Sequence, residues 1–484
     1  MADNGITSFG AYVPRLRLER TAIAAVHRWM APSLKGLAKG ERAFASWDED
    51  AITMAVEAAR DALGGSDRGA IEALTLASTT FPYADLQNSA IAIGALGLDG
   101  RTRASDVGGS QRAGLGGLVQ ALRTGPRDAL YIASDRPRAK PASVSEMGFG
   151  AGAAAFRLGS ENMIARIVGA ANVTTQFIDH FRASDHDHDY FWEERWVRDE
   201  GHAKLLPEVV RTALDEAGVG IADVTTLVMA SPLRGSAVAV AKRLGFTGTL
   251  AADFGETIGY AGTAQPLLML AGALEEAKPG DRILVLAFGT GAEALLLEVT
   301  DAIEPYRKTR GHSLAGRIAD RIVTGDYLRM ASFYGEIDLD WGMRAEKGGK
   351  AALTTLYREA GQLAALVAGK CRACGTVQFP QLPYCVNSAC QAKAAFEQIS
   401  LVDEPAKVLT FTADHLSYYP APPAYVGFAQ FEIGARLLME IVDVGARGLE
   451  VGTPLRLVYR IKEPDKARGF NRYFWKATPV ASEG

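Results

Sequence analysis

The sequence predicts an α/β domain over roughly the first 300 residues, followed by a cysteine cluster and a small β-barrel. Apolar strands alternate with amphipathic helices as far as about residue 300, which is typical of the α/β class. All 4 cysteines of the chain lie between Cys371 and Cys390. After Gln391 several short strands are separated by polar turns, which indicates a small barrel.

The first half of the α/β region reads as strands and helices in turn. The alternating stretch ITSFGAYV predicts a strand that ends at Pro14. A helix follows Asp50, because apolar residues recur on one face, acidic residues precede it and Gly64 ends it. The next elements are predicted as strands over 73–79, 128–135 and 150–159, with a helix over 88–98.

Residues 104–118, ASDVGGSQRAGLGGL, predict a strand, a tight glycine turn and a helix in immediate succession. Such a turn presents one side chain at a helix N-terminus, where backbone N–H groups point toward a bound group. The residue at this point is Gln111.

The second half repeats the order of elements without clear similarity of residues. We expect a glycine turn that leads into a helix over 258–277 and a hairpin of apolar strands over 282–299. Before these come a helix over 204–217, a strand over 225–232 and a helix over 237–245. The region therefore reads as a duplicated α/β unit.

Composition excludes several classes of partner. The formal net charge of −4 and the scattered basic residues give no reason to expect nucleic acid. No uncharged apolar run of about 18 residues predicts a membrane span. Because MADNGITSFGAYVP lacks the apolar core of a signal peptide, we expect a cytoplasmic protein with no membrane partner.

The cysteines have the spacing of a structural metal site. Cys371 and Cys374 form a C-x2-C pair, and Cys385 and Cys390 form a C-x4-C pair. Two such pairs can hold one Zn²⁺ tetrahedrally, which leaves no open position for catalysis. An iron site of rubredoxin type fits the same spacing, and four unrelated cysteines are the remaining alternative.

The C-terminal part resembles the DUF35 family, in which a rubredoxin-like zinc ribbon is joined to an OB-fold. The resemblance covers the chain from about Tyr327 and rests on KCRACGTVQFP and the ending FNRYFWKATPV. It implies a zinc ribbon over 367–395 and an OB-fold over 396–484, preceded by a linker with helical segments over 301–366. DUF35 domains are associated with thiolase-like acyl-CoA enzymes.

Residues 1–300 resemble the thiolase superfamily, in its hydroxymethylglutaryl-CoA synthase and ketoacyl synthase III branch. The matching stretches are GITSFGAYVPRLRL, WDEDAITMAVEAARDAL, LYIASDRPR with GFGAGAAAFRLG, VAKRLG and AFGTGAEALLLEV. The resemblance implies the duplicated thiolase fold, an acyl-CoA substrate and a homodimer.

The catalytic positions depart from that family. Counting from Asp106 and Val107 places Gln111 where the family has its nucleophilic cysteine. The positions of the family's glutamate, histidine and asparagine are taken by Thr79 or Thr80, by Ala230 or Ser231, and by Gly262.

Without the cysteine no acyl-thioester can form on residue 111, because an amide is not a nucleophile. We expect Gln111, with backbone N–H groups of its own and of the turn at Gly289, to form an oxyanion hole for an enolate. The neighbouring residues expected to contact substrate are Ser110, Thr80, Tyr260, Gly262 and Gly291. Ser110 as a replacement nucleophile would need an adjacent base.

The loop DHFRASDHDHD, residues 179–189, is the first place to look for a general base. It holds His180, His186 and His188, and we expect one of these histidines, or Asp185 or Asp187, to act as the base. His186 and His188 are named as the first candidates. A second metal site, or a solvated loop held by salt bridges, are the alternatives for this segment.

Two functions are compatible with these features. The first is an enzyme that cleaves or forms a C–C bond in a β-keto- or β-hydroxyacyl-CoA, by retro-aldol, retro-Claisen or decarboxylation chemistry. Resemblance supports it, since some ketosynthase relatives with glutamine in place of cysteine act as malonyl decarboxylases. Thiolase-like partners of DUF35 proteins in steroid side-chain breakdown look like retro-aldolases. The alternative is an inactive scaffold that binds an acyl-CoA enzyme through its DUF35 part.

Overall fold

The computed structural model describes residues 4–342, 352–393 and 395–480. The chain divides into two compact units. The first contains most of the chain up to Met330, and the second contains the chain from Ala331 together with Trp47–Glu49 and Gly94–Gly97. Helices α10 (Ile303–Thr309) and α11 (Leu314–Ala319) thus belong to the first unit, beyond the expected boundary at residue 300. The expected linker and barrel extend in part over residues 343–351 and 481–484, outside the described residues.

The first unit is built on a 10-stranded sheet in the order β12-β11-β13-β14-β8-β1-β7-β6-β4-β5. Its two halves meet where β8 pairs with β1. The strands of the first half are β1 (Gly5–Tyr12), β4 (Ala73–Ala77), β5 (Arg103–Val107), β6 (Ala129–Asp135) and β7 (Gly152–Gly159). Those of the second half are β8 (Ala165–Thr174), β11 (Thr226–Met229), β12 (Thr249–Leu250), β13 (Arg282–Phe288) and β14 (Gly291–Val299).

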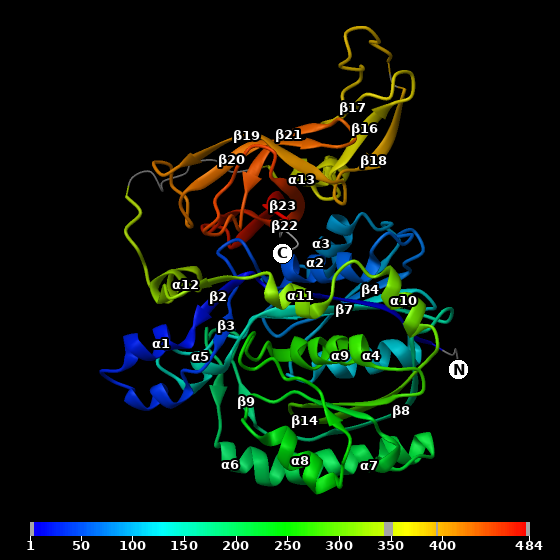
Figure 1. Ribbon diagram of the computed structural model, residues 1–484, viewed down its shortest axis with the longest axis vertical. Helices are drawn as coiled ribbons and strands as arrows, with labels where there is room; N and C mark the ends of the chain where they lie inside the picture. Colours follow the sequence, from blue (N-terminus) through cyan, green and yellow to red (C-terminus); the bar gives the residue numbers. More distant parts are fainter. Residues whose placement is uncertain (1–3, 343–351, 394, 481–484) are drawn as a thin grey trace. The chain divides into compact units, whose positions relative to one another are not determined.

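Helices cover both faces of each half of the sheet. Helices α4 (Ala113–Thr124) and α9 (Gln265–Glu276) lie between the two halves, whereas α7 (Leu206–Ala217) and α8 (Ser236–Leu244) cover the outer face of the second half (Figure 1). Helix α2 (Ala51–Leu63) packs on β1, β6 and β7. The alternation of helix and sheet layers is the duplicated thiolase-like arrangement that the sequence predicts.

Local sequence accounts for the ends of these elements. The carboxylate of Asp50 accepts hydrogen bonds of 3.0 Å from the N–H of Ile52 and 2.9 Å from that of Thr53, which caps α2. Helix α2 ends at Leu63, with Gly64 as its C-cap, as expected. The predicted hairpin over 282–299 is present, since β13 and β14 pair antiparallel from Arg282↔Glu298 to Phe288↔Ala292.

Shorter elements complete the first unit. They include α1 (Arg20–His27), η1 (Pro32–Leu37), α3 (Asn88–Leu96), α5 (Val144–Gly148), α6 (Glu194–Trp196), η3 (Ile221–Asp223), η4 (Gly262–Ala264) and α12 (Tyr327–Phe333), which reaches into the second unit. A π-helical segment, η2 (Val197–Leu205), precedes α7. The short strands are β2 (Leu16–Glu19), β3 (Glu41–Ala43), β9 (His180–Phe181), β10 (Tyr190–Phe191) and β15 (Ile322–Thr324).

The second unit contains a three-stranded ribbon and a closed barrel. The ribbon has the order β17-β16-β18, and the barrel has the order β19-β20-β21-β23-β22. The ribbon strands are β16 (Val367–Cys371), β17 (Val377–Gln378) and β18 (Phe396–Ser400). The barrel strands are β19 (Ala406–Asp414), β20 (Ala424–Phe431), β21 (Arg436–Ile441), β22 (Pro454–Asp465) and β23 (Phe470–Pro479), and helices α13 (Leu353–Arg358) and α14 (Ala360–Leu363) precede the ribbon. A zinc ribbon followed by a small OB-type barrel was predicted, and the prediction is confirmed.

Candidate active site

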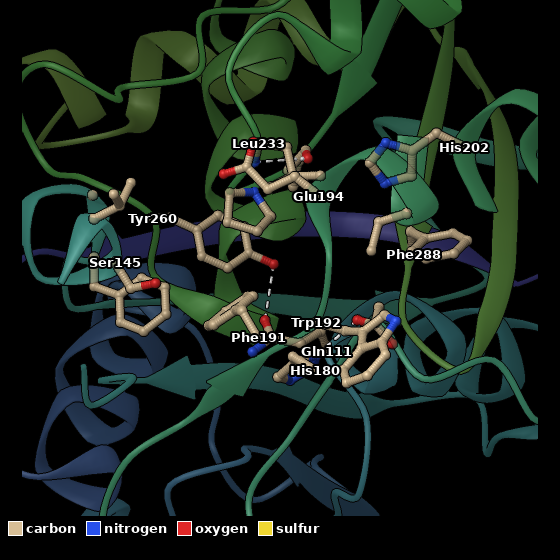
Figure 2. Close-up of a pocket in the computed structure, with 18 residues that line it drawn as sticks. Gln111, Ser145, His180, Phe191, Trp192, Glu194, His202, Leu233, Tyr260 and Phe288 are labelled. Atoms are coloured by element: carbon tan, nitrogen blue, oxygen red, sulfur yellow. Dashed lines mark hydrogen bonds and ion pairs between the residues drawn. The ribbon is translucent and has the colours of Figure 1, made fainter. Parts of the chain in front are cut away.

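A cavity of about 210 Å³ opens beside Gln111 in the first unit. Its walls come from the turn after β5, the segment from Asp179 to His202, the loop after β11 and the residues around Tyr260 (Figure 2). The lining residues used below are Gln111, Phe149, Asp179, His180, Phe191, Trp192, Glu194, Val197, His202, Leu233, Tyr260 and Phe288.

The turn between β5 and α4 positions Gln111. Gly109 adopts a φ of 81°, a conformation that favours glycine. Helix α4 approaches η4 closely, because a Cβ on Gly114 would lie 2.1 Å from the carbonyl oxygen of Thr263. The N–H of Gly114 donates a hydrogen bond of 2.7 Å to the Thr263 hydroxyl. The predicted strand–turn–helix is therefore present, with Gln111 at the start of the helix.

The amide of Gln111 is held in one orientation. The Tyr260 hydroxyl donates a hydrogen bond of 2.8 Å to Gln111 Oε1, as Figure 2 shows. Burial raises the pKa of Tyr260, so this hydroxyl keeps its proton. Gln111 is 5% exposed, and its Nε2 has no hydrogen-bond partner among the described residues. The arrangement leaves a buried amide donor free beside the cavity, which is costly unless a ligand accepts from it.

A carboxylate–histidine pair lines the same cavity. The Nδ1 atom of His180 lies 2.6 Å from Oδ2 of Asp179, whose Oδ1 accepts a hydrogen bond of 3.2 Å from the N–H of Thr290. Burial opposes the charged ring, but the hydrogen bond and the charges of Asp179 and Asp189 outweigh it, and the pKa of His180 is raised. The ring also stacks on Phe191, with centroids 5.3 Å apart.

A second histidine, His202, lines the cavity from η2. It is 4% exposed, and its Nδ1 has no hydrogen-bond partner among the described residues. Its ring packs edge-on against Phe288, with centroids 4.8 Å apart. Burial lowers the pKa of His202 to about 4, so the ring is neutral near pH 7.

The histidines named as base candidates lie elsewhere. The side chain of His186 is 69% exposed and pairs with that of Asp185 at 2.8 Å. His188 is half-buried, and neither residue lines the cavity. Of the three histidines in the loop 179–189, His180 is therefore the one that lines the cavity.

The expected oxyanion role of Gly289 needs correction. Its N–H already donates a hydrogen bond of 3.0 Å to the carbonyl oxygen of Gly291. Its own carbonyl oxygen accepts from the Ser110 hydroxyl at 2.8 Å and from Nε of Arg112 at 3.0 Å. Ser110, Gly289 and Gly291 therefore shape the turn beside Gln111, and none of the three lines the cavity.

Two other predicted contact residues surround a buried carboxylate at the end of β6. Asp135 is fully buried and accepts hydrogen bonds from the hydroxyls of Thr79, at 2.6 Å, and Thr80. Gly262 lies beside the same carboxylate, and the N–H of Thr263 donates to it at 3.0 Å. Thr80 and Gly262 are thus not among the residues that line the cavity, whereas Tyr260 is.

Sequence reasoning missed Asp135 and His202. Asp135 ends a buried apolar strand, and the carboxyl ends of such strands collect functional groups, so a signal was present. His202 is a single histidine in a helical stretch, and nothing in the sequence distinguishes it from a surface residue.

The four cysteines of the second unit fit a tetrahedral metal ion. Their sulfur atoms all lie within 4.8 Å of one another, with Cys371–Cys390 at 3.9 Å and Cys374–Cys385 at 3.5 Å. Zn–S bonds of about 2.3 Å in a tetrahedron require sulfur atoms about 3.8 Å apart. Two turns shape the site, since the N–H of Gly375 donates to the Cys371 carbonyl and that of Cys390 to the Asn387 carbonyl. Cys371, Cys374, Cys385 and Cys390 are arranged to hold one metal ion.

In the described ranges we find no helix with the length and apolarity to cross a bilayer.

Two family models match the chain. Residues 214–299 match the C-terminal part of 3-oxoacyl-[acyl-carrier-protein (ACP)] synthase III, and residues 358–396 match the ChsH2 rubredoxin-like zinc ribbon domain. The hydroxymethylglutaryl-CoA synthase of Aeropyrum pernix is 33% identical over 315 residues, which cover 62% of this chain and 86% of that protein. That of Methanosarcina mazei is 33% identical over 353 residues, or 69% of this chain and 99% of that protein.

The chain belongs to the hydroxymethylglutaryl-CoA synthase family. Solved structures show the same fold for the first part of this family member. A crystal structure of HMG-CoA synthase complexed with CoA has a TM-score of 0.59 and 16% identity, and it covers 72% of this chain and 95% of that one. The 3-oxoacyl-(acyl carrier protein) synthase III of Pseudomonas aeruginosa, with a TM-score of 0.54 and 20% identity, covers 62% and 99%. The family resemblance stated above is confirmed, together with the zinc ribbon.

Proposed function

We propose that the protein cleaves, or in reverse forms, the Cα–Cβ bond of a β-hydroxyacyl-CoA by aldol chemistry without an acyl-enzyme. The observation that carries the proposal is the amide nitrogen of Gln111, which has no partner among the described residues and lies at a cavity that the Asp179–His180 pair also lines. One group can stabilise an enolate oxygen and the other can move a proton. Those are the two requirements of a retro-aldol step.

In the cleavage direction, His180 accepts the proton of the β-hydroxyl group. The Cα–Cβ bond then breaks, its electron pair moves to the α-carbon and the thioester oxygen, and the β-carbon becomes a carbonyl. The Gln111 amide donates to the enolate oxygen, and Tyr260 keeps the amide turned toward it. His180 finally returns the proton to the α-carbon, so acetyl-CoA and an aldehyde or ketone leave. Asp179 stabilises the charged imidazole between the two proton transfers.

The coenzyme A arm has space next to this cavity. A second cavity of about 410 Å³ shares Gly148, Ala230, Ser231, Pro232, Leu233 and Tyr260 with the first. The exposed Arg234 lines the second cavity, and a guanidinium group pairs well with phosphate. Relatives are named hydroxymethylglutaryl-CoA synthases, and one solved neighbour contains CoA. These observations support a CoA thioester as substrate.

The other predicted properties remain part of this proposal. We expect a homodimer in the cytoplasm, with neither nucleic acid nor membrane as partner, and a zinc ion with a structural role. Bound Zn²⁺ would cross-link the two cysteine turns of the ribbon. The scaffold alternative has no observation of its own in its favour, whereas the Gln111 donor and the His180 pair favour an enzyme.

The test uses purified full-length protein with 3-hydroxyacyl-CoA esters and follows acetyl-CoA by chromatography. We expect turnover without any acyl adduct on the protein by mass spectrometry. Gln111→Ala should lower kcat about 100-fold, since it removes an oxyanion donor. A matched control is Gln120→Ala on an exposed position of the same helix α4, which should leave kcat unchanged. A stable acyl adduct, or binding of CoA esters without turnover, would refute the proposal.

A further inference from the structure

The residues that line the cavity indicate which kind of acyl group it can bind. This inference rests on the function proposed above. Four aromatic side chains from three places in the chain line it: Phe149, Phe191 with its neighbour Trp192, and Phe288. A cavity of about 210 Å³ exceeds the roughly 150 Å³ apolar cavity that accepts benzene in another protein. The space therefore suits a ring-sized apolar group better than a methyl group.

The charge of the walls argues against an anionic acyl group. Among the described residues, those that line the cavity include the acids Asp179 and Glu194 but neither lysine nor arginine. A carboxylate on the substrate would face these acidic groups in a mainly apolar space, and the cation nearest to it, the His180 imidazolium, is already paired with Asp179, which makes the arrangement unfavourable. A neutral acyl group avoids that cost.

His202 adds one polar requirement. In Figure 2 its ring lies well apart from Gln111 and next to Phe288. The ring belongs to a π-helical segment, a feature frequent at functional sites. The preceding Gly201 allows the close packing there, because a Cβ on it would lie 2.5 Å from Cζ of Phe288.

The Nδ1 atom of His202 is buried and unpartnered among the described residues, and a neutral imidazole both donates and accepts. A hydroxyl group on the ligand can bind Nδ1 in either state, since it can donate a hydrogen bond to it or accept one from it. We infer that the substrate is a CoA thioester whose acyl group is neutral, is about the size of a ring and carries a hydroxyl group remote from the thioester. His202 determines specificity by binding this hydroxyl group. The contact would leave the reacting carbons to Gln111 and His180.

The test separates binding from chemistry with CoA esters that have no β-hydroxyl and cannot undergo the aldol reaction. The probes are 3-phenylpropanoyl-CoA and its 3- and 4-hydroxyphenyl analogues, titrated calorimetrically into the full-length protein. At least one hydroxylated ester should bind about 10-fold more tightly than the unsubstituted ester, since a buried polar group left unpaired is costly. 3-Hydroxy-3-methylglutaryl-CoA should bind more weakly than any of them.

Two variants assign the discrimination to His202. His202→Phe should bind all three esters with equal affinity, at the level of the unsubstituted ester with the unmodified protein. His202→Asn, whose amide lies near the place of Nδ1, should restore part of the preference and shows that the site remains folded. Equal affinities with the unmodified protein, no binding of any aryl ester, or tighter binding of 3-hydroxy-3-methylglutaryl-CoA would each overturn the inference.

Turnover is measured separately with the corresponding 3-hydroxy-3-arylpropanoyl-CoA esters, which would yield acetyl-CoA and an aromatic aldehyde. If the binding preference is present and depends on His202 but no aldehyde forms, the inference stands and the proposed reaction fails. If aldehyde forms with no dependence on the ring hydroxyl, the reaction stands and the inference fails.

Discussion

The hydroxyl group of Tyr260 lies 2.8 Å from the side-chain oxygen of Gln111, and this hydrogen bond orients the amide nitrogen away from Tyr260. The two residues are 149 positions apart in the chain. Tyr260 follows the glycine turn before α9, and Gln111 precedes α4. Because α4 and α9 pack together between the halves of the sheet, the duplication of the fold creates this pair.

Removal of this hydroxyl group tests whether the amide orientation matters. Tyr260→Phe should lower kcat about 10-fold with little change in KM, because the donor is needed most when the enolate forms. Tyr306→Phe is a matched control, since the Tyr306 hydroxyl donates at 2.8 Å to the Phe9 carbonyl oxygen, and neither residue lines the cavity. It should cost about 1 kcal/mol of stability and leave kcat unchanged. Equal kinetic effects of the two variants would contradict the role of Tyr260.

The His180 pair predicts the pH dependence of turnover. The pKa of His180 is raised, so the neutral base form becomes dominant only above about pH 6.5, and kcat should increase with pH through that raised pKa. Asp179→Asn removes the hydrogen-bonded charge. It should shift the increase of kcat to lower pH and reduce the maximum kcat reached at high pH. Asp185→Asn, in the exposed Asp185–His186 pair, should leave the profile unchanged.

His180 and His202 make the stability of the first unit change with pH in opposite directions. Since the pKa of His180 is raised on folding, its contribution is fully present below about pH 6.5 and is lost as pH rises through the raised value. The pKa of His202 is lowered to about 4, so its neutral form favours the folded state above about pH 6.5, and that contribution is lost between this pH and about 4. Between pH 6.5 and 4, the free energy of unfolding measured with urea should therefore decrease less for His202→Phe than for the unmodified protein. A larger decrease for the variant would contradict this prediction.

The cysteine site predicts one zinc ion per chain by elemental analysis. Chelation or Cys371→Ser should remove the metal and reduce the order of the second unit, because metal binding contributes directly to the folding of such ribbons. Ser388→Ala, between two ligand cysteines, is the control and should retain the metal. Iron in place of zinc would give visible absorbance and would correct the identity of the metal. Absence of any metal would reject the site.

The close contact between α4 and η4 predicts that no side chain larger than that of glycine fits at position 114 without loss of stability. Gly114→Ala should lower the free energy of unfolding by about 1–3 kcal/mol, since the added Cβ would lie 2.1 Å from the Thr263 carbonyl oxygen. Gly36→Ala in η1 has nothing within 4 Å of the added Cβ and should be nearly neutral. Chemical denaturation compares the two. A Gly114→Ala protein as stable as Gly36→Ala would show that α4 can move away from Thr263.

Local patterns in the sequence predicted the α/β class, the metal site and a small barrel, and the resemblance to known families implied the thiolase fold and the OB-fold. Apolar periodicity predicted the helix that Asp50 caps and the 282–299 hairpin, and cysteine spacing predicted the ribbon. The glycine turn predicted the place of Gln111 at the start of α4. Each of these depends on residues close together in the chain, where steric and hydrogen-bonding preferences act directly.

The composition of the cavity depended on the tertiary structure. Sequence reasoning selected the segment 179–189 but named His186 and His188, since exposure of a loop histidine cannot be read from its neighbours in the chain. The burial of His180 and the lack of a partner for Nδ1 of His202 among the described residues follow from contacts between distant elements. The sequence by itself determined the α/β class of the first unit, the cysteine ribbon and the place of Gln111 at the start of a helix. Only the packing of the two halves decided which polar groups are buried without partners, because desolvation depends on every element that surrounds a group.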